Sequence, residues 1–197
     1  MTSGDGLSDV LEPVRDLHVS AILHAIAEAL DSGAEVDPEP VDRDAEGRMR
    51  RSGPLGLPSR SDLRVTKGGR TLLRKATSEP ALPFAPRSLL LSDGASARIG
   101  PFGWGATPVR LTGAPGAPNW APLRRWYLEW FQPRFGEESP DLLCVVHALD
   151  GPHVDGRGWR YDVDLGSASV MGFRAMLEAL SVSGCARIAV GEITLAS

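Results

Sequence analysis

The last third of the chain carries the pattern that most restricts its fold. Residues 159–166, WRYDVDLG, alternate between apolar and polar side chains, which is typical of a strand with one buried face. The apolar run LLCVVHAL at 142–149 predicts a strand before it, and the Gly/Asp/Pro-rich stretch 150–158 predicts the loop that joins the two. Residues 167–184 then predict a helix that ends at a glycine, and residues 186–196 predict a final strand.

Another helix is expected just before these segments. Residues 119–132, NWAPLRRWYLEWFQ, begin with a good N-cap residue and carry aromatic side chains at helical spacing, which we expect to pack against a sheet. The C-terminal order is therefore helix-strand-strand-helix-strand. This order predicts an α+β fold, with a mainly antiparallel sheet and helices packed on one face.

Composition divides the chain into three parts. Residues 1–33 predict an amphipathic helix, because their apolar side chains recur at helical spacing. Residues 34–60 carry four prolines and alternating charges, which predicts a flexible linker. Residues 61–197 predict a single α+β domain, which begins with a hairpin around Gly68 and Gly69.

Charge is distributed unevenly along the chain, although the net charge is only −4. Residues 1–41 carry nine acidic groups and one basic group, whereas residues 42–87 carry eleven basic and five acidic groups. Such segregation is typical of a chain that binds through complementary charge, or of two segments that neutralise each other.

Several features predict a cytoplasmic protein. We find no signal peptide at the N-terminus and no run of ~20 apolar residues that could span a membrane. Cys144 and Cys185 lie in apolar runs, which is typical of free buried thiols, with a disulfide between adjacent strands as the alternative. The abundance of Ala, Arg, Gly and Pro suggests a bacterial source.

The polar face of the strand at 159–166 and the loop before it form the candidate site. Asp162 and Asp164 share this face with Arg160, and a strand places their side chains roughly 6–7 Å apart. The candidate binding residues are the polar groups of this hairpin and two tryptophans that could anchor a partner: Trp104, His147, Asp150, Asp155, Trp159, Asp162 and Asp164.

Two classes of function are consistent with this pattern. The first is a non-catalytic cytoplasmic protein-binding module, of the immunity, antitoxin or assembly-accessory type, whose acidic hairpin face binds a protein with a basic surface. No cofactor is expected, and a homo-oligomer is compatible with the sequence. The alternative is a small metal-dependent hydrolase in which His147, Asp162 and Asp164 hold the metal, which requires these three side chains to converge in a pocket.

Nucleic acid is not the expected partner. Basic side chains do cluster between Arg60 and Arg87, as phosphate binding requires. However, no aromatic residue lies between Arg43 and Lys75, so bases would lack a platform on which to stack. We expect this segment to be a solvated face or a surface for an acidic partner, and the acidic first helix of the same chain could be that partner.

Overall fold

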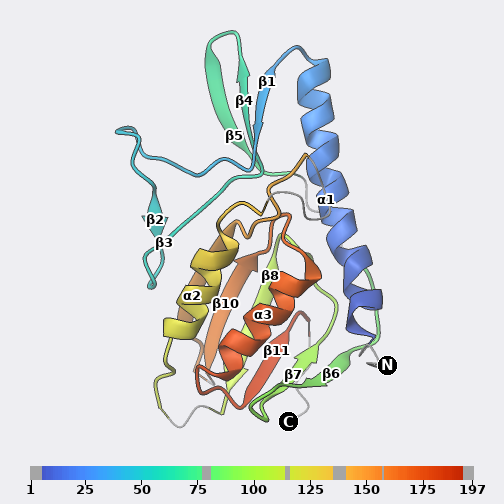
Figure 1. Cartoon of the computed structure of the whole chain (residues 1–197), viewed down its shortest axis with the longest axis vertical. Coiled ribbons are helices and arrows are strands. Elements are labelled where there is room, and N and C mark those ends of the chain that lie inside the picture. The colour runs from blue at the N-terminus through green and yellow to red at the C-terminus, as the bar shows by residue number, and fades with distance from the viewer. Residues whose placement is uncertain (1–5, 77–80, 114–115, 135–140, 157, 193–197) are drawn as a thin grey trace.

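A six-stranded sheet forms the largest layer of the protein (Figure 1). The computed structural model describes residues 6–76, 81–113, 116–134, 141–156 and 158–192. The strand order is β6-β7-β11-β8-β10-β9, and every neighbouring pair is antiparallel except β7 and β11. The strands are β6 (Arg87–Leu90), β7 (Ser96–Ile99), β8 (Thr107–Thr112), β9 (Ala148–Val154), β10 (Trp159–Asp164) and β11 (Arg187–Val190).

Helices α2 (Ala121–Trp130) and α3 (Val170–Ser181) lie side by side on the same face of this sheet (Figure 1). The core fills the space between the two layers, where Tyr127 and Phe173 are completely buried. Strands alternate accordingly, since Val109 and Leu111 of β8 are buried and Arg110 between them is exposed. The predicted α+β class with a mainly antiparallel sheet is confirmed. Along the chain the last elements are α2, β9, β10, α3 and β11.

Helix α1 (Leu7–Asp31) runs along the side of the molecule and reaches a second, smaller sheet (Figure 1). Its first half packs into the main core through Leu7, Leu11 and Val14. Its last turns pack on the small sheet, where Ala29 joins a separate apolar cluster with strand β4. That sheet has the order β1-β4-β5, with β1 (Glu35–Pro38), β4 (Leu63–Lys67) and β5 (Arg70–Arg74).

The hairpin predicted around Gly68 and Gly69 is confirmed by the pairing of β4 with β5, and both glycines adopt the positive φ that its turn requires. Residues 34–60, for which the sequence predicts a flexible linker, contain β1 and a two-stranded ribbon of β2 (Arg51–Ser52) and β3 (Leu57–Pro58). The first helix also starts earlier than Pro13 would suggest, at Leu7.

The strand predicted at 142–149 is wrong for most of its length. Strand β9 begins only at Ala148 and continues through Pro152, where the sequence predicts a loop. Residues 142–147, which come before β9, are largely buried although they belong to no strand. Their backbone donors bond to scattered partners, with Val146 N–H donating to the carbonyl of Trp130 and His147 N–H to that of Asp164. These residues therefore pass through the core without joining the sheet.

Among the described residues, no helix combines the length and the apolar character that a membrane span requires.

Candidate functional site: a buried charge cluster and an open sheet face

A fully buried histidine lies at the centre of a group of acidic side chains. Nδ1 of His147 lies 2.8 Å from Oδ1 of Asp62, and its Nε2 lies 2.8 Å from Oε1 of Glu39. A neutral imidazole can donate from only one nitrogen, so two carboxylate partners favour the doubly protonated ring. Burial alone would lower the pKa of His147, but the hydrogen bonds to Asp62 and Glu39 and the nearby Asp164 outweigh it and raise the pKa to about 10. We call Glu39, Asp62, His147 and Asp164 the buried cluster.

The backbone fixes the two carboxylates that bond to His147. Oε2 of Glu39 accepts from Leu143 N–H at 2.5 Å, and Oδ2 of Asp62 accepts from Ala76 N–H at 2.6 Å. Burial would raise the pKa of both carboxyl groups, yet hydrogen bonds from His147 lower it, so both are held ionised. Glu39 also adopts a left-handed backbone with φ of 49°, which is strained for a residue with a Cβ and is often found at functional sites.

Asp164 ends β10 beside this group. Its Oδ1 lies 3.9 Å from Nδ1 of His147 and accepts from Gly166 N–H at 3.1 Å. Its Oδ2 pairs with Nζ of Lys75 at 2.9 Å, and the lysine side chain is largely exposed. Burial would lower the pKa of Lys75, but the charge of Asp164 outweighs it and raises the pKa. Lys75 therefore lies between the buried cluster and solvent.

A second histidine, His18 of α1, faces the same carboxylates. It is 8% exposed, and its Nε2 is buried without a hydrogen-bond partner among the described residues. One potential ligand atom from each of His18, Asp62 and Asp164 lies within 4.8 Å of the others. Burial lowers the pKa of His18, although Asp164 and Asp62 oppose this effect, so the ring is held neutral.

Two glycines leave room for the two rings. A Cβ on Gly105 would lie 2.5 Å from Cε1 of His18, and a Cβ on Gly166 would overlap the His147 ring. Gly166 also has a positive φ, but Gly105 does not, so the contact with His18 is the structural reason for a glycine at 105.

The opposite side of the six-stranded sheet from α2 and α3 is the second candidate region, which we call the open face. Strand register aligns Arg98 of β7, Ala189 of β11, Arg110 of β8 and Arg160 of β10 in one row across the sheet. Arg110 and Arg160 are directly opposite each other, an arrangement that is unfavourable for like charges. Each has an acidic partner, since Arg110 pairs with Asp155 at 2.8 Å and Arg160 with Asp162 at 2.6 Å.

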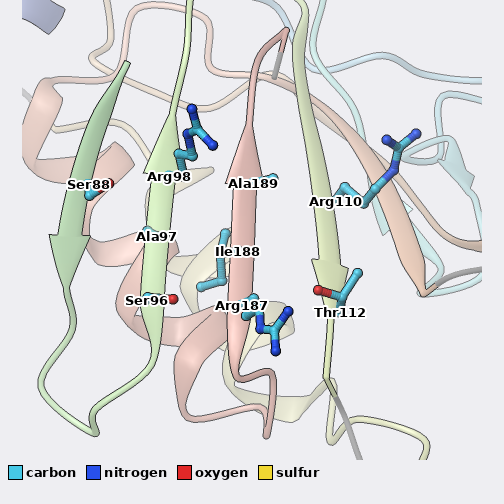
Figure 2. Close-up of a pocket in the computed structure, with 9 residues that line it drawn as sticks. All are labelled: Ser88, Ser96, Ala97, Arg98, Arg110, Thr112, Arg187, Ile188 and Ala189. Atoms are coloured by element: carbon cyan, nitrogen blue, oxygen red, sulfur yellow. The ribbon is translucent and has the colours of Figure 1, made fainter. Parts of the chain in front are cut away.

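A hollow of about 440 Å³ lies on this face, over β7, β11 and β8 (Figure 2). Ala189 lies between Arg98 and Arg110 in this row and contributes only a methyl group, which leaves a depression between the two longer side chains. Arg187 lies at the other end of the hollow, and the hydroxyl groups of Ser88, Ser96 and Thr112 complete its polar lining. No carboxylate of a described residue pairs with Arg98 or Arg187.

The structure separates the predicted site residues into four environments. His147 and Asp164 belong to the buried cluster, whereas Asp155 and Asp162 lie on the open face in ion pairs. The exposed Asp150 lies 3.2 Å from His153. Neither tryptophan is free to anchor a partner in the way the sequence suggests: Trp104 is 1% exposed and stacks on Phe102, and the half-buried Trp159 packs edge-on against Trp120.

Sequence reasoning missed three members of this site. Glu39 lies in the segment predicted as a linker, Asp62 lies at the start of the predicted hairpin, and His18 lies in the first helix. A signal for His18 was present, because it falls on the buried face of α1, two turns after Leu11 and one turn before Ile22. A histidine on an apolar helical face indicates a buried polar partner.

No family model matches the chain, and searches of curated proteins and of solved structures found no match. The chemistry of the two regions therefore carries the argument for function. The buried cluster can hold a proton or a cation away from solvent, and the open face can bind an anionic group with arginine and hydroxyl donors.

Proposed function

We propose that the chain is a non-catalytic cytoplasmic protein-binding module, and that the open face of its six-stranded sheet binds an acidic surface of another protein. The observation that supports this most directly is the row of arginines beside a hollow on an exposed sheet face. Asp155 and Asp162 balance the charges of Arg110 and Arg160 in this row, so the arginines at its other end remain available to a partner.

The charge of the partner follows from which side chains remain unpaired. Asp155 and Asp162 each form an ion pair with an arginine of the same face. Arg98 and Arg187, in contrast, have no such partner among the described residues. Guanidinium groups bind carboxylates through two parallel hydrogen bonds, which suits an Asp- or Glu-rich segment. The proposal keeps the binding module expected from the sequence but changes its partner's surface from basic to acidic.

The surroundings of the arginines favour a protein over a nucleic acid. The hollow is lined by short hydroxyl and methyl groups, and none of its described lining residues is aromatic, so bases would have no platform to stack on. Leu90 of β6 is 76% exposed and projects from the same face, because it pairs with Ser96. An apolar side chain beside a charged hollow is typical of protein interfaces.

The alternative function, a metal-dependent hydrolase, needs His147, Asp162 and Asp164 in one pocket. His147 and Asp164 do lie close together. Asp162 instead pairs with Arg160 on the open face, where its carboxylate is half-exposed. We therefore do not extend the hydrolase proposal to these three residues.

Native mass spectrometry of the full chain, purified gently from its own cells, tests the binding proposal. We expect a second, acidic protein to copurify with the wild type and to be lost from the double variant Arg98→Gln, Arg187→Gln. Arg70→Gln is the matched control, because Arg70 is an exposed arginine on the small sheet. The complex should also weaken as salt is raised, since its charges are exposed.

Two outcomes would contradict this function. The wild type could purify without any second protein, or the double variant could retain the partner as well as the control does. Equal binding of a short Asp/Glu-rich peptide by wild type and double variant at low salt would argue against the open face in the same way.

A further inference from the structure

We propose that His18, Asp62 and Asp164 form a binding site for a divalent transition-metal ion such as Zn²⁺. The site is separate from the open face and does not depend on the function proposed for it.

The three side chains already lie close to the arrangement that one ion requires. One potential ligand atom from each lies within 4.8 Å of the other two. Zinc binds nitrogen and oxygen ligands at about 2.0–2.2 Å, so atoms that share an ion lie about 3–4 Å apart. Small side-chain movements toward a common centre would therefore complete the site.

His18 supplies the observation that separates this site from an ordinary acidic cluster. Its Nε2 is buried without a hydrogen-bond partner among the described residues, and the side chain is 8% exposed. Buried polar atoms are nearly always paired, so the unpaired nitrogen calls for a partner, and a bound ion supplies one because a ring nitrogen of His18 lies within 4.8 Å of oxygens of Asp62 and Asp164. Gly105 keeps the space for this ring, because a Cβ there would lie 2.5 Å from Cε1 of His18.

His147 acts as a positioning residue and is not a ligand. Both of its ring nitrogens are engaged, one by Asp62 and the other by Glu39, so neither is available to a metal. Through Nδ1 it orients the Asp62 carboxylate, and Ala76 N–H holds the second oxygen of that group. Ligating carboxylates are commonly oriented by such hydrogen bonds.

Lys75 occupies one oxygen of the proposed ligand Asp164. Its Nζ is 2.9 Å from Oδ2 of Asp164, but 64% of its side chain is exposed, so the ammonium group can move into solvent. A divalent ion on Asp164 would repel this ammonium group. Lys75 therefore competes with the metal for Asp164.

The donor set determines the class of ion. One imidazole nitrogen with two carboxylate oxygens suits Zn²⁺ and its neighbours, whereas Mg²⁺ and Ca²⁺ prefer oxygen ligands alone. Three protein ligands also leave a position for water, as in catalytic zinc sites.

Isothermal titration of chelator-treated full chain with Zn²⁺ tests the site, with thermal melts alongside. We expect one ion per chain, a rise in Tm of about 5–10 °C at an ion concentration of about 100 Kd, and no response to Mg²⁺. His18→Gln should weaken binding about 100-fold or more. The matched control, His24→Gln, removes an exposed histidine of the same helix and should leave binding unchanged.

Lys75→Ala gives a second test that removes no apolar packing, because the Lys75 side chain is largely exposed. Loss of the competing ammonium should tighten Zn²⁺ binding about tenfold. If His18→Gln does not melt cooperatively, this variant decides the question, and unchanged affinity would reject the site. Failure of the wild type to bind Zn²⁺, or equal binding by wild type and a folded His18→Gln, would also overturn the proposal.

Discussion

The buried cluster and the open face use similar charged groups in opposite ways. In the cluster, His147 is completely buried and both of its nitrogens bond within the chain. On the open face, Arg98 and Arg187 are exposed and have no acidic partner among the described residues. Charges that are desolvated and satisfied internally affect folding and pKa values, whereas charges left in solvent are available to a partner. Substitutions in the two regions should therefore have different consequences, which the following experiments test.

The largest effect is expected from His147→Ala. This change would leave Glu39 and Asp62 facing each other without the cation between them, and breaking a buried charge pair costs about 3–5 kcal/mol. Urea unfolding measures the loss. His153→Ala is the control on the sheet face, where we expect a change within about 0.5 kcal/mol. Similar losses for both histidines would mean that burial does not distinguish the two regions.

The stability of the chelator-treated wild type should fall both at high pH and at low pH because of the buried cluster. The pKa of His147 is raised from 6.5 to about 10, so its contribution is complete below pH 6.5 and is lost as the pH rises toward 10. The pKa values of Glu39 and Asp62 are lowered, so their contribution is present above about pH 4–5 and is lost as the pH falls. The free energy of unfolding should therefore be highest between about pH 5 and 6.5, and denaturant melts across pH should show this maximum in the wild type. A His147→Ala profile that still declines between pH 6.5 and 10 to the same extent would contradict the assignment.

Gly105→Ala should destabilise the protein by about 1–3 kcal/mol, because the added methyl group would overlap the His18 ring. The double variant Gly105→Ala, His18→Ala should recover part of that loss, since the ring is then absent. Thermal melts of the two single variants and the double variant measure this coupling. Additive losses would show that Gly105 and His18 do not constrain each other.

The smallest effect is expected on the open face. Asp162→Asn would release Arg160 from its ion pair and should tighten binding of an Asp/Glu-rich peptide by up to about fivefold, with stability changed by less than about 0.5 kcal/mol. Fluorescence anisotropy at low salt measures the affinity. Weaker binding to this peptide, together with binding to a basic one, would restore the partner expected from the sequence.

Sequence patterns predicted the elements better than the site. Period-two alternation identified β10, and the turn glycines identified the β4–β5 hairpin, because these signals are local. The buried cluster depends on contacts between residues far apart in the chain, such as His147 with Glu39 and with Asp62. Nothing in the composition of 34–60 marks Glu39 as buried.

Asp162 and Asp164 illustrate this limit. Alternation correctly assigns both to the same side of β10. It does not predict that one is half-exposed and the other buried. Asp162 lies within strand β10, where Arg160 of the same strand reaches it. Asp164 lies at the strand end, beneath Lys75 and beside the cluster. Two aspartates of one strand face therefore lie in two unrelated environments because their positions in the strand differ.

The contacts of α1 also set an order of events during synthesis. Leu7, Leu11 and Val14 enter the same core cluster as residues of α3, and Arg15 donates to the carbonyl of Ala168 just before that helix. About 150 residues must leave the ribosome between these partners, so the first half of α1 emerges long before its docking surface on the main core exists. During that interval Leu7, Leu11 and Val14 lack the core partners that the C-terminal part of the chain supplies. The first half of this helix therefore docks late although it comes early in the chain, whereas its last turns can pack on β1 and β4 as soon as those strands have emerged.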